Sequence, residues 1–178
     1  NYPFYAINSV AADNILSDQE RQAVNDAKPS ASNTTLFTLG YEGVSLEHYL
    51  NKLLINDVKV LVDVRRNPLS MKFGFSKNQL VKYCASLGIE YMHFPEVGID
   101  ADQRQELHSQ ADYDKLFESY KKHLPKTAST QDLLIGLLVK YKRIALTCFE
   151  ANICQCHRKH LAEALEDHPN FTFTVKHI

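Results

Sequence analysis

Short apolar runs alternate with amphipathic segments from residue 36 to the end of the chain. The runs are rich in β-branched and aromatic residues and are predicted to be strands: 36–39, 59–64, 89–94, 144–148 and 171–175. The segments between them repeat apolar residues at helical spacing. Strands that alternate with helices form mostly parallel sheets, because each right-handed crossover places a helix over the sheet. The sequence therefore predicts an α/β fold, with a mostly parallel sheet of about five strands and helices on both faces.

Polar residues mark the starts of several predicted helices. Ser45 precedes apolar residues that share one helical face, namely Leu46, Tyr49, Leu50, Leu53 and Leu54. Ser76–Gln79 has the spacing of a capping box, and Gly88 is placed to end that helix. Further helices are predicted near 113–123 and 130–141, and a last helix carries Leu161 and Leu165.

Residues 1–35 differ from the remainder and are predicted to be an N-terminal extension and linker, with 36–178 as the α/β domain. Ser17–Glu20 has capping-box spacing and predicts one short helix, while 28–33 has the composition of a linker. The apolar segment Tyr2–Ile7 is suited to docking, and an upstream domain of the same polypeptide is the expected partner. The chain begins with Asn1 rather than Met, which suggests a processed or excised piece of a longer protein.

Composition excludes several classes of protein. The formal net charge is −1, so no global basic field gathers nucleic acid, although a local basic patch remains compatible with it. No apolar run is long enough to cross a bilayer and no signal-peptide pattern opens the chain, so we predict a cytoplasmic protein without a membrane partner. The four cysteines are too few for a disulfide scaffold and are expected to be reduced thiols: Cys84, Cys148, Cys154 and Cys156.

Polar residues follow the predicted strands at the points where those strands end. The chemically most useful of them are Gly40 and Tyr41 after the first strand, Asp63, Arg65 and Ser70 around and after the end of the second, Glu96 after the third, and Cys148, Glu150, Cys156, His157 and Arg158 at and after the end of the fourth. The carboxyl ends of parallel strands lie at one edge of a sheet. We therefore expect these four loops to converge on one ligand site.

Asp63 lies in an apolar strand, where an unpaired carboxylate is costly. Arg65 stands two residues further on and faces the same side. Two interpretations stay open, namely a structural ion pair that fixes the loop, or an Arg65 that binds a phosphate or carboxylate while Asp63 orients it. Arg66 points the other way and is predicted to face solvent.

Two cysteines, two glutamates and His157 are the candidate catalytic groups. Cys156 stands at a predicted helix start beside His157 and Arg158, where a thiol pKa is expected to fall, and it is the preferred nucleophile. Cys148 is the second choice, and a buried structural role stays open for both thiols. Glu150 and Glu96 could serve as acid and base, with loop-anchoring or solvated carboxylates as the alternative.

A metal site is the main rival to thiol chemistry. Cys148, Cys154, Cys156 and His157 are ligands of the kind that zinc accepts. Paired C-x₂-C elements are absent, however, and adjacent residues at a helix start point about 100° apart, so no metal site is predicted. No Arg stands six residues after a Cys, so the pattern of a phosphatase-like nucleophile is absent. The chain also has no Walker A sequence and no G-x-G-x-x-G, so neither ATP nor a dinucleotide is predicted, and no cofactor is expected.

Seven short motifs together resemble the DUF488 family, over about residues 36–168: Thr38–Tyr41, Val62–Arg65, Pro68–Ser70, Phe73–Phe75, Pro95–Gly98, Cys148–Glu150 and Cys156–Arg158. The resemblance implies an α/β domain. It also implies that these residues match the family signature: Gly40, Asp63, Arg65, Pro68, Ser70, Glu96, Gly98, Cys148, Glu150, Cys156, His157 and Arg158. Many members have a His after the first glycine, where this chain has Tyr41, so no imidazole acts at that position. The family is named for a domain of unknown function, so the resemblance implies no reaction.

Three functions stay open at this point. The first is an enzyme acting on a phosphate-bearing ligand, such as a nucleotide or a nucleic-acid end. Arg65, Arg158 and the N–H groups of the last helix would hold the anion. The second is a noncatalytic sensor or adaptor that binds the same ligands and reports to an upstream domain. The third is a thiol redox or metal-binding module.

Overall fold

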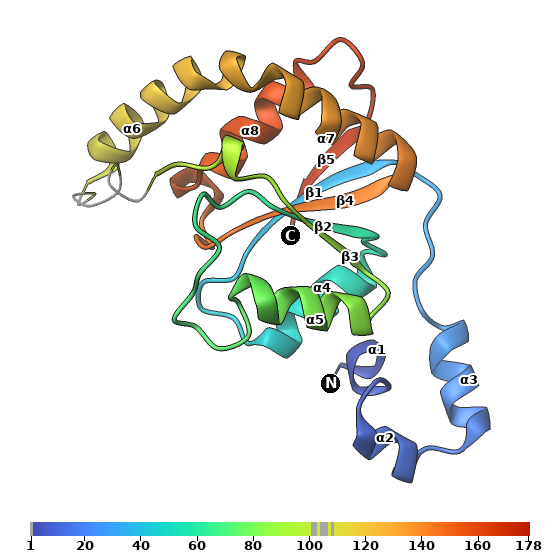
Figure 1. Cartoon of the computed structure of the whole chain (residues 1–178). Helices are drawn as coiled ribbons and strands as arrows, with labels where there is room; N and C mark the ends of the chain where they lie inside the picture. Colours follow the sequence, from blue (N-terminus) through green and yellow to red (C-terminus); the bar gives the residue numbers. More distant parts are fainter. Residues whose placement is uncertain (1, 101–102, 104–106, 108) are drawn as a thin grey trace.

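The structure is a computed structural model that describes residues 2–100, 103, 107 and 109–178 (Figure 1). Its strands are β1 (Thr35–Gly40), β2 (Val60–Asp63), β3 (Glu90–His93), β4 (Arg143–Cys148) and β5 (Thr174–His177). They form one sheet in the order β3-β2-β4-β1-β5, and all the strand pairs are parallel. The predicted α/β fold is confirmed.

Helices cover both faces of the sheet (Figure 1). One face carries α4 (Leu46–Ile55) and α5 (Lys77–Ser86), which pack on Phe37, Leu39 and Leu61. The other face carries α6 (Gln110–His123), α7 (Ala128–Tyr141) and α8 (His157–Glu166), which pack on Leu36, Val62 and Leu146. Because successive strand residues point to opposite faces, each central strand contributes to both cores.

The direction of the chain reverses between β2 and β4. From β1 the chain proceeds to β2 and then to β3 at one edge, and it returns through β4 to β5 at the other edge. The connections that leave the neighbouring strands β2 and β4 therefore run in opposite directions. Such a reversal opens a crevice above the carboxyl ends of the two strands, which is the usual ligand position in open α/β sheets.

Two of the three predicted helix caps are confirmed. The Ser45 side chain accepts a hydrogen bond from His48 N, and Ser17 and Glu20 form a complete capping box. The capping box predicted at Ser76 is wrong. Ser76 Oγ instead accepts from Ser70 N and donates to Ser70 O, because the loop before α5 folds back over the start of the helix.

The last strand begins later than predicted, at Thr174 rather than Phe171. Phe171 and Phe173 pack on each other, with ring centroids 5.4 Å apart, and against the core beneath α7 and α8. The alternating apolar residues that predicted a strand here are therefore core-packing residues of the irregular segment before β5. The sequence pattern alone does not distinguish such a segment from a strand.

The first 35 residues hold three short helices where one was predicted: α1 (Pro3–Ala6), α2 (Val10–Ile15) and α3 (Asp18–Asp26). Phe4 and Tyr5 pack against the core on the α4 side, and the Tyr2 hydroxyl lies 3.2 Å from His48 Nδ1. The apolar start of the chain thus docks on its own domain. None of the helices that the structure describes combines the length and the apolar character needed to cross a bilayer.

The described part of the chain also contains the 3₁₀ turns η1 (Pro95–Val97), η3 (Leu124–Thr127) and η4 (Ile153–Gln155). The first follows β3 and the last leads from β4 into α8. Both therefore lie in loops that leave the carboxyl edge of the sheet. The segment between η1 and α6 contains the residues that the structure leaves undescribed.

Candidate functional site

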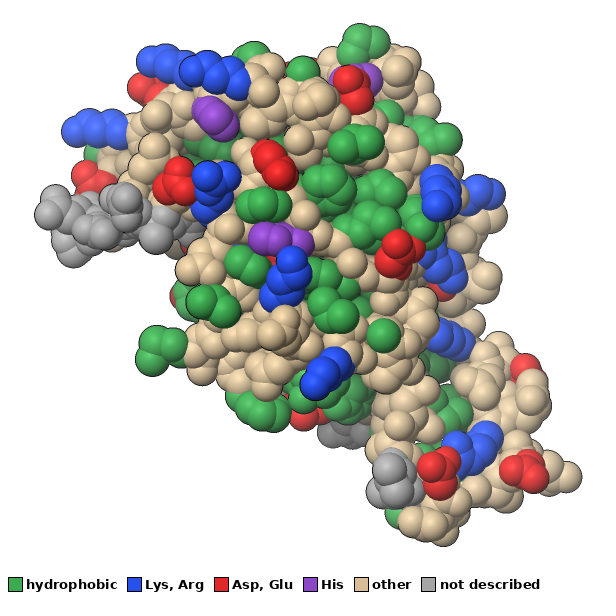
Figure 2. Space-filling view, in the orientation of Figure 1, with side chains coloured by type: hydrophobic (Ala, Val, Ile, Leu, Met, Phe, Trp, Pro, Cys, Tyr) green, Lys and Arg blue, Asp and Glu red, His purple; other side chains and the backbone are tan. Residues whose placement is uncertain are grey.

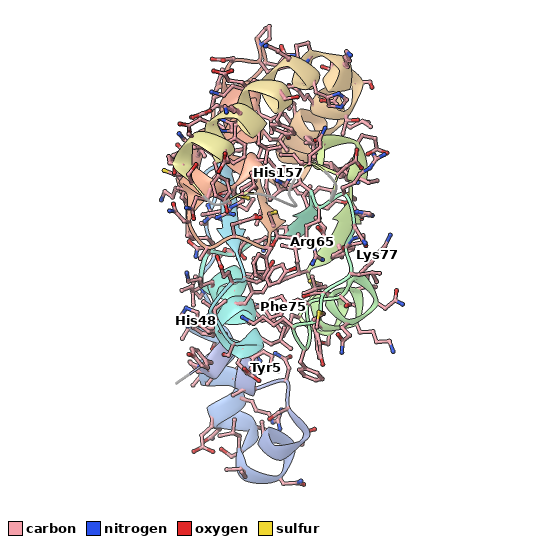
Figure 3. All side chains as sticks on the ribbon, turned by 90° about the vertical axis from the view of Figure 1, so that its left-hand side faces the viewer. Tyr5, His48, Arg65, Phe75, Lys77 and His157 are labelled. Carbon is pink, nitrogen blue, oxygen red and sulfur yellow. The ribbon has the colours of Figure 1, made fainter. Side chains whose placement is uncertain are left out.

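A cleft of about 460 Å³ lies over the carboxyl ends of the strands. Its walls come from Tyr41 after β1, from the segment 65–72 after β2, from Ile99 after β3, and from Cys148 and His157 at the end of β4 and the start of α8. The predicted convergence of the four loops is confirmed, because Arg65 and His157 line the same cleft. Figure 3 shows these two labelled side chains between the helical layers.

Two glycines let the loops approach this closely. A Cβ added to Gly40 would lie 1.9 Å from the carbonyl oxygen of Glu150, and one added to Gly98 would lie 2.3 Å from the backbone nitrogen of Arg66. Both obstacles are backbone atoms, which cannot turn aside as the end of a side chain can. Gly40 thus joins the loops after β1 and β4, and Gly98 joins those after β2 and β3.

Asp63 is fully buried and is the acceptor at the centre of a polar network. Arg65 Nε lies 2.9 Å from Asp63 Oδ1, and Arg65 Nη2 and the Tyr91 hydroxyl both donate to Asp63 Oδ2. Arg65 Nη1 donates to the Tyr41 hydroxyl at 2.6 Å and to the Phe75 carbonyl at 3.0 Å. The structure favours the ion pair that fixes the loop over an Arg65 free to grip a ligand.

The charge state of Arg65 follows from this network. Burial by itself lowers the pKa of a guanidinium, but the hydrogen bond and charge of Asp63 outweigh it, so the pKa of Arg65 is raised. Arg65 therefore stays a permanent cation beside the cleft. Asp63 is its counter-charge, so the pair as a whole adds little net charge to the cleft.

The Arg158 side chain holds the loop after β4 in place. It is buried, and its Nη1 and Nη2 donate to the carbonyl oxygens of Glu150 and Ala151. The same loop is held from the other side, where Tyr41 N and Glu42 N donate to Phe149 O. Arg158 is not among the residues that line the cleft. The cleft geometry therefore does not support the predicted contact between Arg158 and an anion.

Three buried side chains form a reactive cluster at the floor of the cleft: Cys148, Cys156 and His157. Their sulfur atoms and one imidazole nitrogen all lie within 4.8 Å of one another. Cys148 Sγ lies 3.7 Å from His157 Nδ1 and donates to Glu150 Oε2 at 3.0 Å. His157 Nε2 lies 3.0 Å from the Val64 carbonyl, which can only accept, so Nε2 carries the proton and Nδ1 faces the sulfur.

The expected fall in the pKa of Cys156 is wrong. Burial, then the hydrogen bond and charge of Cys148 and the charge of Glu150, raise the pKa of Cys156 well above its usual range, and the charge of Arg158 opposes them only in part. The reason is that Cys156 is fully buried rather than open at a helix end. Cys148 borders the cleft and is the better placed of the two thiols for a ligand.

The adjacency argument against convergent side chains is also wrong. Cys156 is the residue before α8 and has an extended backbone, with φ −131° and ψ 133°. The 100° step between neighbours applies only within a helix. Both Cys156 and His157 can therefore point toward Cys148.

The remaining predicted residues have different places. Ser70 lines the cleft and its hydroxyl accepts from Lys72 N, which shapes the loop. Glu96 is exposed on η1 and does not line the cleft. Cys154 is exposed, whereas its neighbours in the cluster are buried.

The sequence reading missed two cations of the cleft. Arg66 is exposed, as predicted, but it also lines the cleft. Lys72 lines it too, and its Nζ donates to Tyr41 O at 2.7 Å. The signal was present, since both belong to the segment 64–76 between β2 and α5, which has three basic residues and no acidic one. The local sequence does not show that this segment folds back over the edge of the sheet.

A larger cavity of about 640 Å³ lies between α6, α7 and α8. Its walls include His160, Glu163 and Lys121, and none of the predicted site residues. The smaller cleft is the stronger candidate, because only it joins a buried thiol and imidazole to loops from four strands.

Comparison with known proteins identifies the family of this chain. The sequence profile of the family described as "Domain of unknown function DUF488" matches residues 45–165, which covers more than half of the chain. The chain is a member of the DUF488 family. No curated protein and no solved structure matched it. Within the matched DUF488 region lie the loops after β2, β3 and β4, and therefore most of the cleft.

Proposed function

We propose that this DUF488 protein is an enzyme that acts on a phosphate-bearing ligand, such as a nucleotide or a nucleic-acid end, bound in the 460 Å³ cleft. The observation that carries the proposal is the lining of the cleft. It contains three basic side chains, Arg65, Arg66 and Lys72, and no Asp or Glu among the lining residues that the structure describes. A partly enclosed site of one sign favours an anion.

Two of these cations have the exposure needed to meet a ligand. The Arg66 side chain is 48% exposed and its Nε pairs with Asp100 at 2.8 Å, a solvent-screened contact that an anion can replace. Lys72 is half-buried and uses one of its three donors on Tyr41 O. Arg65 lies beside them but is paired with Asp63, so Arg66 and Lys72 are the two cations left for a ligand. The attraction is local, since side chains of both signs are interspersed over the face shown in Figure 2.

Apolar groups beside the cations fit the remainder of a nucleotide. Phe149, Leu69 and Met71 line the cleft while remaining exposed. The Phe149 ring stands edge-on to Tyr41, with centroids 5.4 Å apart, so one ring is held in place by another. An exposed, positioned aromatic ring can stack on a nucleobase, and such stacking is tolerant of base identity.

The cluster at the floor supplies the chemistry. Cys148 Sγ has an imidazole nitrogen on one side and the Glu150 carboxylate on another, at 3.7 and 3.0 Å. A thiol beside two proton acceptors can lose its proton to one of them and act as a nucleophile. The Glu150 carboxylate can instead act as a general acid or base. The carboxylate of Glu96 is exposed outside the cleft, so we give the acid–base role to Glu150.

Binding of a 5′-phosphorylated oligonucleotide and of nucleoside monophosphates tests the proposal. The double variant Arg66→Ala/Lys72→Ala is expected to weaken binding at least about tenfold, since a charge-assisted contact is worth 1.5–3 kcal/mol. Lys82→Ala is the matched control, because Lys82 is exposed on α5 outside the cleft. Equal affinity in the wild type and the double variant would remove the phosphate site.

Turnover separates the enzyme from the second candidate. With a ligand that binds, the Cys148→Ser and Glu150→Gln variants are each expected to retain affinity and to lose product formation. If the full chain binds the oligonucleotide or the nucleoside monophosphates but converts none of them, the result would instead support a noncatalytic sensor or adaptor.

A further inference from the structure

We infer that Cys148, Cys156 and His157 form a binding site for one divalent cation of the zinc type, open on the side of the cleft. The three donors are two sulfur atoms and one imidazole nitrogen, all within 4.8 Å of one another and all buried. Zinc is bound by this mixture of cysteine and histidine ligands. The site uses residues from the end of β4 and the start of α8.

The spacing of the donors is close to that of a tetrahedral centre. With Zn–S near 2.3 Å and Zn–N near 2.05 Å, two ligands at the tetrahedral angle lie roughly 3.6–3.8 Å apart. Cys148 Sγ and His157 Nδ1 are 3.7 Å apart. The other separations are at most 4.8 Å, so a shift of about 1 Å brings the third donor to the centre.

The histidine is already oriented as a ligand. Its Nε2–H donates to the Val64 carbonyl at 3.0 Å, which leaves the Nδ1 lone pair directed at the cysteines. A hydrogen bond of this kind on the far nitrogen is the usual support of a metal-binding imidazole. The ring also stands edge-on to Tyr120, with centroids 5.4 Å apart, which restricts its rotation.

Charge balance favours a divalent ion in this position. Cys148, Cys156 and His157 are at most 2% exposed, so an uncompensated charge there is costly. Two thiolates and a neutral imidazole carry a charge of −2, which a divalent cation cancels. The loaded site therefore buries no net charge.

The fourth coordination position faces the cleft. Cys148 and His157 line the cleft and Cys156 lies behind them, so the three protein ligands approach from the closed side. Three protein ligands and one open position are typical of catalytic rather than structural zinc. In the loaded site Cys148 is a ligand, so its role as a free nucleophile under the proposed function belongs to the metal-free cluster. The use of the fourth position for a phosphate oxygen or a water rests on the proposed function, whereas metal binding itself does not.

Metal titration of the reduced, chelator-treated chain tests the site. We expect one equivalent of Zn²⁺ to bind in competition with a chromophoric chelator. Co²⁺ in the same site is expected to give thiolate charge-transfer absorption together with the visible bands of tetrahedral coordination. This spectrum needs no variant, so it stays informative if a substituted cluster fails to fold.

Variants locate the ion. Cys148→Ser, Cys156→Ser and His157→Ala are each expected to weaken Zn²⁺ binding at least tenfold, with folding checked by circular dichroism. Cys154→Ser is the matched control, because Cys154 is exposed two residues from Cys156 and is expected to have no effect. Glu150→Gln is expected to bind one equivalent of Zn²⁺, as the wild type does. Loss of the ion in that variant would show that Glu150 is the fourth ligand and would refute an open fourth position.

Two results would overturn the metal site, namely no stoichiometric binding to the wild type, or binding that survives in all three cluster variants. The phosphate proposal fails separately. The Arg66→Ala/Lys72→Ala variant is expected to bind Zn²⁺ normally, so a chain that binds the ion but no phosphate-bearing ligand would refute only the proposed function.

Discussion

Asp63 is the residue on which the loop after β2 depends. Its carboxylate is fully buried and accepts from the Arg65 side chain, the Arg65 backbone and Tyr91. Without Asp63 the Arg65 guanidinium, itself 5% exposed, would be a buried charge with no counter-charge. The ion pair between Arg66 and Asp100 is exposed. The two adjacent arginines therefore allow a buried ion pair to be compared with an exposed one.

The Asp63→Ala variant is expected to lose about 3–5 kcal/mol of unfolding free energy, because it leaves a buried charge uncompensated. Asp100→Ala is expected to lose at most about 1 kcal/mol, as an exposed ion pair does. Urea denaturation of both variants measures the difference. Similar losses in the two would show that burial of the Asp63 pair does not govern its energy.

At the scale of elements, the cleft exists because loops from different strands touch backbone to backbone. Gly40 brings the loop after β1 against Glu150, and Gly98 brings the turn after β3 against Arg66. Ser76 and Ser70 fold the segment before α5 back on itself. These contacts join segments that are distant in the chain, so each loop supports the position of another.

Gly40→Ala is expected to destabilise the protein by about 1–3 kcal/mol, the range found when atoms are forced into filled space. Gly136→Ala is the control, because Gly136 lies inside α7 and an added Cβ there meets nothing within 4 Å. That change is expected to stabilise by about 0.5–1 kcal/mol. Thermal denaturation of the two variants should give shifts of opposite sign, and shifts of the same sign would contradict the close approach at Gly40.

At the scale of the whole molecule, the core beneath α4 and α5 holds groups that ionise in alkaline solution. Burial, with the charge of Asp63, raises the pKa of Cys84 to about 12 from its usual 9. Burial also raises the pKa of Tyr49, and burial with the charge of Asp63 raises that of Tyr91. The unfolded chain therefore releases these protons at lower pH than the folded chain does.

Stability is accordingly expected to fall as pH rises above about 9. A raised folded-state pKa gives stability that is complete below the unfolded pKa and is lost as pH approaches the folded value, by about 1.4 kcal/mol per pH unit for each group. Urea midpoints measured from pH 8 to pH 11 test this, and Cys84→Ala should make the decline shallower. A flat profile in the wild type would refute the expectation.

The local pattern of the sequence determined the architecture of this protein. The alternation of apolar runs with amphipathic segments placed four of the five strands and the parallel sheet, and the polar residues after each strand indicated the edge where the cleft lies. The caps at Ser45 and Ser17 were equally local. These features could be predicted because the period of a strand or helix, and the hydrogen bonds of a helix end, involve residues a few positions apart.

Only the tertiary structure decided which of these residues meet. It paired Arg65 with Asp63, one of two roles that the sequence left open, and it placed Arg66 and Lys72 in the lining of the cleft. It buried Cys156 beside Cys148 and thereby raised a pKa that the helix-end position alone would lower. The physical reason is that burial and long-range contact set the partner and the charge of a side chain, and both depend on how loops that are distant in the chain pack together.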